Sequence, residues 1–334
     1  MDKATYETTK YIKGPMHQSL RHDSAHKHVA GSAEYIDDIP EPAGLLHGAL
    51  GMADRAHADI LSIDLSAVKA YPGVVYVLTA ADITGVNDVS SGGRHDEPLI
   101  ATDKIEFHGQ TIFAVIAETR DAARKAARLA KVEYRDLPFW TDIDGALLGY
   151  KNVTDPLTLK RGDAVAELEL APRRIKGEMR IGGQEHFYLE SHIALAIPGE
   201  DDDVTVWSST QHPSEIQHIV GHVLDIPSNA ITVSTRRMGG GFGGKETQGN
   251  QFAALAALAA KKLNRAVQFR PDRDEDMGVT GKRHDFKMDF DVAFDNDGKI
   301  HAIEANFAAR CGYSSDLSGP VTDRALFHAD SSYF

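Results

Sequence analysis

Residues 236–246 read RRMGGGFGGKE and place five glycines within the six positions 239–244. The β-branched run at 231–235 predicts a strand before this loop, and the alanine-rich run after it predicts a helix that the loop opens and that ends near Leu263. A glycine-rich turn at the start of a helix brings bare backbone amides close to a ligand and favours an anion such as a phosphate. A tight turn alone needs one or two glycines, so the surplus favours a binding function.

The loop also matches parts of two nucleotide-binding patterns. Gly239, Gly241 and Gly244 fit the dinucleotide fingerprint, so a nicotinamide-dependent dehydrogenase stays an alternative. The acidic residue that this fingerprint expects about 20 residues downstream is poorly placed, since Asp272 is the nearest candidate. A phosphate-binding P-loop is excluded, because Glu246 stands where its magnesium-binding Ser or Thr must be and would repel a triphosphate.

A second polar cluster lies upstream, in the segment GGQEHFYLE at 182–190. It brings together an amide, two carboxylates, an imidazole and a phenol directly after two glycines. A functional site and a strand edge with satisfied polar groups explain this cluster equally well. Glu185 and His186 make too short a pair for a metal site, and no third ligand has a recognisable spacing. His218 and His222 are predicted to lie on the solvated face of a helix.

Composition limits the classes of function. The chain has 334 residues, with 36 Lys and Arg against 49 Asp and Glu, for a formal net charge of -13. This acidic balance argues against binding to nucleic acid or to an anionic membrane, both of which need a basic surface. The one cysteine, Cys311, cannot form an internal disulfide or hold an iron–sulfur cluster. The N-terminus has no apolar signal core, and the apolar run at 252–260 is too short to span a membrane, so we expect a cytoplasmic protein.

The pattern of elements predicts an α+β chain in two domains. We expect a loose N-terminal arm at 1–22, a first domain at 23–136, a linker at 137–162 and a second domain at 163–334. Residues 85–110 are predicted to form a surface excursion, and a helix at 120–131 is predicted to leave Arg124 on its solvated face. Apolar residues alternate with polar ones from 286 to 294 before the turn at 295–298, which predicts a hairpin. Strands are also predicted at 74–78, 111–117, 174–181, 193–197, 204–208 and 266–269, with a helix after Pro213.

Five motifs in order make the chain recognisable. They are GGQEHFYLE (182–190), SSTQHPSEIQ (208–217), RRMGGGFGGKE (236–246), TGKRHDF (280–286) and DRALFHAD (323–330). Together they resemble the molybdenum-cofactor subunit of the xanthine dehydrogenase/aldehyde oxidase family, in particular that of bacterial xanthine dehydrogenases. The segment HDSAHKHVAGSAEYIDDIPEP, from His22, resembles the start of that family's α/β hammerhead domain. The resemblance implies a hammerhead domain followed by the first part of a mixed α+β molybdopterin-binding domain.

The resemblance also implies a bound molybdopterin with molybdenum. Gln184 matches the glutamine that hydrogen-bonds an oxygen ligand of the molybdenum, and Phe242 matches the phenylalanine whose backbone flanks the metal. Gly240, Gly241 and Gly243 belong to the glycine-rich backbone against which the cofactor lies. The 2Fe–2S and FAD centres of such an enzyme are implied to lie on a partner subunit, which makes the parent enzyme a hetero-oligomer.

Two further matches imply a purine substrate. Glu246 matches the glutamate that binds the purine, and Arg324 matches the arginine that faces it. A carboxylate can hydrogen-bond ring N–H groups and orient the purine, while a fixed guanidinium stabilises negative charge on the ring. Aldehyde-oxidising relatives typically lack this pair. The implied reaction is therefore the oxidation of hypoxanthine and xanthine to urate.

The chain departs from the family pattern in its later part. The family's large subunit is more than twice as long, and its second FRGFGG-type loop and its base glutamate have no counterpart here. We therefore expect an N-terminal fragment of that subunit without a catalytic base of its own. Two alternatives stay open: an aldehyde-oxidising member of the family, and a binding or assembly module without activity.

Overall fold

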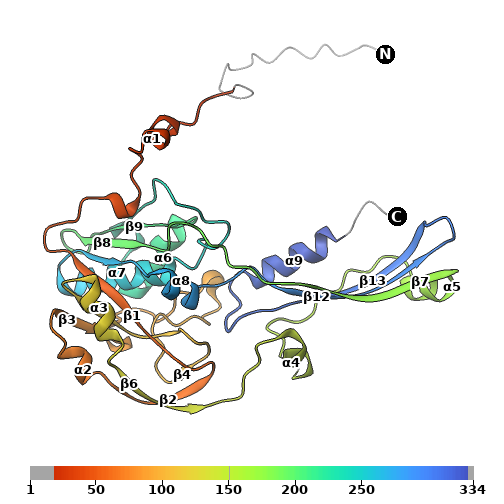
Figure 1. Ribbon diagram of the computed structural model, residues 1–334, viewed down its shortest axis with the longest axis horizontal. Helices are drawn as coiled ribbons and strands as arrows, with labels where there is room; N and C mark the ends of the chain where they lie inside the picture. The colour runs from red at the N-terminus through yellow and green to blue at the C-terminus, as the bar shows by residue number, and fades with distance from the viewer. Residues whose placement is uncertain (1–18, 150, 330–334) are drawn as a thin grey trace.

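The computed structural model of the chain describes residues 19–149 and 151–329 and contains one large mixed sheet, a long three-stranded sheet and a smaller one. The predicted α+β class is confirmed. Most of the arm predicted at 1–22 lies outside the described residues, as does Asp330 of the last motif. Figure 1 shows a body that holds the large sheet, with the long three-stranded sheet extending from it as a ribbon.

The large sheet combines strands from both predicted domains. Its parallel pair β1 and β11 places Leu46 opposite Val267 and Gly48 opposite Phe269. Buried residues from both sides of the predicted linker at 137–162 share one hydrophobic cluster, so the two regions form a common core. In order across the sheet, the strands are β10 (Ile231–Ser234), β9 (Val204–Ser208), β8 (Ala194–Pro198), β11 (Val267–Phe269), β1 (Leu46–Met52), β5 (Thr111–Ala117) and β3 (Val74–Leu78).

A smaller sheet completes the first region. The helix predicted at 120–131 is too long, because one strand of this sheet begins before the predicted helix ends. The helix α3 ends at Ala127, and Lys131 already begins strand β6. Val132 and Tyr134 of this strand pack partly buried against the core, which explains why the chain leaves the helical conformation there. The elements are α1 (Ala25–Val29), β2 (Ala58–Asp64), α2 (Ser66–Lys69), β4 (Lys104–Ile105), α3 (Arg120–Ala127) and β6 (Lys131–Asp136).

Two further expectations for the first region are wrong. Arg124 does not lie on a solvated face, because its guanidinium forms ion pairs with Asp272 and Glu275 at the start of α8 (Arg273–Val279). The stretch at 85–110 is not a surface excursion throughout. Its members Val89, Glu97, Leu99, Ile100, Ala101 and Ile105 are buried.

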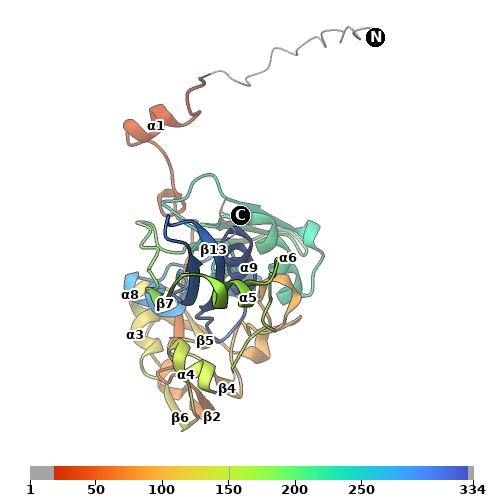
Figure 2. The same cartoon turned by 90° about the vertical axis from the view of Figure 1, so that its right-hand side faces the viewer.

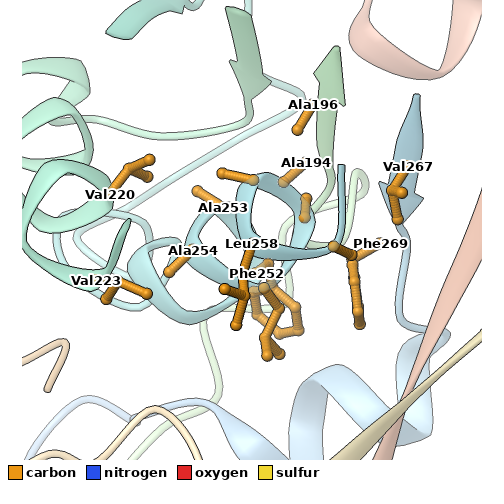
Figure 3. Packing of buried hydrophobic residues seen from close by; sticks show 14 of the residues in the cluster. Ala194, Ala196, Val220, Val223, Phe252, Ala253, Ala254, Leu258, Val267 and Phe269 are labelled. Carbon is orange, nitrogen blue, oxygen red and sulfur yellow. The ribbon is translucent and has the colours of Figure 1, made fainter. Parts of the chain in front are cut away.

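Helix α7 (Asn250–Leu263) is the centre of the main core. Its segment 252–260 is buried on every side, as a helix that is apolar all round must be. Val220 and Val223 of α6 (Pro213–Leu224) cover one side of α7, and strands β8 and β11 cover another (Figure 3). The predicted order of strand, glycine loop and helix is right, but the helix begins at Asn250 and not at the loop.

The predicted hairpin is confirmed and forms most of the ribbon. β12 (Phe286–Phe294) pairs antiparallel with β13 (Ile300–Ala309) on one side and with β7 (Arg173–Ile181) on the other. Figure 2 looks along this ribbon, with β7 and β13 in front of the body. α9 (Ser318–His328) lies beside the ribbon, and α5 (Ala164–Leu170) packs against its far part (Figure 1). α4 (Ile143–Leu148) lies within the predicted linker.

None of the helices in the described parts of the chain has both the length and the apolar character needed to cross a bilayer. The long apolar run in α7 is accounted for by burial in the protein core.

The pairing of β1 with β11 gives a stability prediction. A Cβ atom at Gly48 would overlap the Phe269 ring, so we expect Gly48→Ala to lower the free energy of unfolding by about 1–3 kcal/mol. Urea unfolding measures this loss. Gly312→Ala is the matched control, since a methyl group there meets open space. Unchanged stability of Gly48→Ala would contradict the close contact between the two strands.

Candidate functional site

The glycine loop at 239–244 packs against the segment 182–190, so the two clusters singled out in the sequence form one site. A Cβ atom at Gly244 would lie 2.7 Å from the His186 ring, and one at Gly241 would lie 2.6 Å from Oε1 of Gln211. Only glycine permits these approaches. Close packing therefore explains part of the glycine surplus that we interpret from the sequence in favour of binding.

Glu190 holds the start of the loop. Its backbone N–H donates to the Gly239 carbonyl at 3.2 Å, and its carboxylate accepts a hydrogen bond from the Gly239 N–H at 2.8 Å. The Ser209 hydroxyl donates to the same carboxylate oxygen at 2.6 Å. Hydrogen bonds to Glu190 therefore fix the backbone at the point where the loop begins, after β10 and the turn that follows it.

Lys245 holds the end of the loop with a fully buried ammonium group. Its Nζ donates to the Glu190 carbonyl at 2.7 Å and to the Ser209 Oγ at 2.8 Å, and it lies 3.5 Å from the Glu190 carboxylate. Nζ also lies 4.4 Å from the centre of the Tyr188 ring, in cation–π range. Burial lowers the pKa of Lys245, and the charge of Glu190 opposes this shift.

The middle of the loop keeps free hydrogen-bond donors. Oε1 of Gln211 accepts hydrogen bonds from the N–H groups of Gly243 at 3.0 Å and Lys245 at 3.2 Å. The three N–H groups at 240–242 donate to no acceptor within residues 19–149 and 151–329, and of the three residues Gly241 is buried, Gly240 is half-buried and Phe242 is exposed. Phe242 adopts a left-handed φ of 54°, and its side chain is 76% exposed. Adjacent free amides of this kind can bind an anion or the acceptor atoms of a cofactor.

A buried polar layer lies behind the loop. The Asp276 carboxylate accepts hydrogen bonds from the Tyr188 hydroxyl and the His192 backbone N–H, both at 2.6 Å. Burial alone would raise the pKa of Asp276, but hydrogen bonds from His192 and Tyr188 outweigh it and hold that pKa well below its usual value. Burial lowers the pKa of His192. The Asp276 carboxylate, held by His192, therefore supports the Tyr188 ring that contacts the loop.

Sequence reasoning gave no role to Gln211, Lys245, His192 or Asp276. The first two lie inside quoted motifs, so the motifs themselves signalled their place beside the loop. His192 and Asp276 carry no motif signal, because their pairing joins residues that are far apart in the chain.

The predicted site residues lie on three parts of the fold. Gly240, Gly241, Phe242 and Gly243 form the loop, and only the Gly243 amide among them is occupied by another residue of the described chain. Gln184 is exposed and pairs through its backbone with Arg283. Glu246 is half-buried after the loop, Arg324 is exposed on α9, and no hydrogen bond or ion pair joins them. Within the described residues, no group of three or more His, Cys, Asp or Glu could hold a metal ion.

A separate set of contacts anchors the loop that leads into α9. Glu97 accepts a hydrogen bond from the Ser314 hydroxyl at 2.5 Å, and Asp96 accepts one from the Ser315 N–H at 2.9 Å. Burial raises the pKa of Glu97 to about 7, and neighbouring carboxylates add to this shift. Burial also raises the pKa of Asp316 in the anchored loop. The carboxylates that face Glu97 are Asp88, Asp96 and Asp316.

Two family descriptions match the chain. The description "Molybdopterin cofactor-binding domain" matches residues 149–334, which include the glycine loop, the segment 182–190 and α9. The description "Aldehyde oxidase and xanthine dehydrogenase, a/b hammerhead domain" matches residues 30–138.

Curated relatives match almost the whole chain. The xanthine dehydrogenase/oxidase of Gallus gallus is 41% identical over 323 residues, which cover 96% of this chain and 24% of the relative. The xanthine dehydrogenase of Dictyostelium discoideum is 40% identical over 327 residues, which cover 97% of this chain and 24% of the relative. The chain therefore spans about a quarter of the length of these relatives.

Solved structures show the same similarity. Aldehyde oxidoreductase from Desulfovibrio gigas superposes with a TM-score of 0.81 at 26% identity, covering 90% of this chain and 35% of that one. Quinoline 2-oxidoreductase from Pseudomonas putida 86 superposes with a TM-score of 0.75 at 28% identity, covering 86% of this chain and 38% of that one.

The anchor of α9 gives a pH prediction. With its pKa raised from 4.5 to about 7, Glu97 keeps its proton in the folded chain where the unfolded chain releases it. The folded state therefore loses stability as pH rises from about 4.5 to 7, by at most roughly 3 kcal/mol. We expect Glu97→Gln to lack this loss and to melt above the wild type at pH 8. The difference in melting temperature between the two proteins at pH 5 and pH 8 measures it.

The exposed Glu200 supplies the control for this experiment. Glu200→Gln should keep the pH dependence of the wild type. Equal pH dependence in Glu97→Gln and the wild type would show that Glu97 is not protonated in the fold.

Proposed function

The chain belongs to the aldehyde oxidase and xanthine dehydrogenase family, and we propose that it is the part of a purine-oxidising molybdenum hydroxylase that holds the molybdopterin. The proposed reaction is the oxidation of hypoxanthine and xanthine to urate. The observation that carries the proposal is the row of free amides at 240–242, inside the region that matches the molybdopterin-binding description.

The residues at the loop suit the chemistry of the cofactor. A pterin and its phosphate present hydrogen-bond acceptors, and backbone N–H groups at 240–242 are donors without a partner in the described chain. The side-chain amide of the exposed Gln184 supplies a further donor from the segment beside the loop. When bound, the molybdenum cofactor supplies the oxygen-transfer and electron-accepting chemistry of the hydroxylation. We propose that Gln184 and Phe242 lie next to the metal.

The proposed substrate residues are Glu246 and Arg324. The Glu246 carboxylate would accept hydrogen bonds from purine N–H groups and orient the ring. The Arg324 guanidinium would stabilise the negative charge that develops on the ring during attack. Both side chains are free of hydrogen bonds and ion pairs within the described residues, which leaves their polar atoms for a ligand.

We propose that the 2Fe–2S and FAD centres which take up the electrons lie on a partner subunit. An iron–sulfur cluster needs several thiolates, and this chain has only Cys311. A cytoplasmic location is part of the same proposal, because the free Cys311 thiol suits a reducing compartment.

Substitutions test the substrate assignment in the enzyme that contains this chain. We expect Glu246→Ala and Arg324→Ala each to lower kcat/KM for xanthine by a factor of about 10² to 10³, while molybdenum content stays within about twofold of the wild type. Steady-state assays with xanthine and metal analysis measure the two quantities. Glu200→Ala and Arg128→Ala remove exposed charges elsewhere and should leave both unchanged.

The alternatives predict different results. An aldehyde-oxidising enzyme would turn over benzaldehyde but not xanthine, and the purine proposal would then be wrong. A binding or assembly module would contain no molybdenum and would oxidise neither compound. If a variant lost molybdenum and activity to the same extent, the residue replaced, Glu246 or Arg324, would bind the cofactor and not the substrate.

A further inference from the structure

We propose that Glu190 and Lys245 form a clamp that holds both ends of the glycine loop and so keeps the amides at 240–242 aimed at the cofactor. These are positioning residues that act through the loop. The inference rests on the proposed function, since it names what prepares the cofactor site.

The geometry shows that one residue fixes both ends of the loop. Glu190 exchanges two hydrogen bonds with Gly239, at 2.8 and 3.2 Å, where the loop begins. Its carbonyl accepts a hydrogen bond from Lys245 at 2.7 Å, where the loop ends. The Ser209 hydroxyl joins the two side chains, with 2.6 Å to the carboxylate and 2.8 Å to the ammonium. Gln211 restrains the stretch between, so the free amides lie between fixed points.

The two charges of the clamp, on Lys245 and Glu190, are opposite in sign and both lie in a buried environment. Lys245 is fully buried and the Glu190 side chain is only 14% exposed, so neither charge has water as its main partner. Removing one member of such a pair leaves a lone buried charge and is strongly destabilising, whereas replacing both by neutral groups often leaves stability intact. We therefore expect the fold to keep its stability when both charges are removed together. The orientation of the loop is the property that the pair adds.

A set of variants separates positioning from stability. Lys245→Met leaves the Glu190 carboxylate unpaired, Glu190→Gln leaves the ammonium unpaired, and the double variant removes both charges. We expect both single variants to melt below the wild type and the double variant to melt within about 2 °C of it. In all three, amide hydrogen exchange of the loop peptide at 239–246 should be about tenfold faster than in the wild type. Molybdenum content should fall at least about fivefold in all three, the double variant included.

Lys261→Met is the matched control, because this lysine also lies in an ion pair, with Asp202, but on the surface of α7. It should leave loop exchange and molybdenum content as in the wild type. The experiment uses the enzyme that contains this chain, produced in cells that make the molybdenum cofactor.

Two results would overturn the clamp. If the double variant regains molybdenum together with its melting temperature, the pair serves stability alone. If loop exchange in Lys245→Met equals that in Lys261→Met, the pair does not hold the loop. A wild-type enzyme that contains no molybdenum would contradict the proposed function instead. The exchange comparison then still decides the clamp, because it needs no cofactor.

Discussion

The ammonium group of Lys245 is fully buried, and a buried charge is tolerated only when it is paired and hydrogen-bonded. This constraint determines the surroundings of the glycine loop. The Glu190 carboxylate and carbonyl, the Ser209 hydroxyl and the face of Tyr188 each satisfy part of the requirement. These groups come from segments that are distant in sequence. The contacts that compensate the Lys245 charge therefore hold the loop, the segment 182–190 and the end of β9 close together.

A second layer of contacts connects this arrangement to the first region of the chain. Tyr188 is held by Asp276 on α8, and the start of α8 is paired with Arg124 on α3. The parallel pairing of β1 with β11 joins the same two regions through backbone hydrogen bonds. The hammerhead region therefore does more than flank the cofactor-binding region, since it supplies one side of the core and an ion pair to the helix behind the loop.

Local patterns predicted the elements that depend on local chemistry. The apolar run at 111–117 and the alternation from 286 to 294 before a turn are confirmed as β5 and β12. The missed features depend on distant partners. β6 is a strand because Val132 and Tyr134 meet a core built elsewhere, and Arg124 is paired because α8 approaches α3. In the site, the motifs located the loop and the segment 182–190, but the buried charges between them follow only from the fold. The roles of Gln184, Glu246 and Arg324 stay predictions.

Different contacts hold the glycine loop and helix α9 in place. The amides at 240–242 depend on an ion pair that is closed off from water, whereas Arg324 depends on α9 and on the carboxylate cluster around Glu97. In the first arrangement the Lys245 ammonium donates to the Glu190 carbonyl and to the Ser209 hydroxyl, whereas Oε1 of Glu190 is buried without a hydrogen-bond partner in the described residues. The second contains a buried carboxyl whose pKa is about 7, next to other acidic groups. A change in pH near neutrality therefore acts on the anchor of the loop that leads into α9.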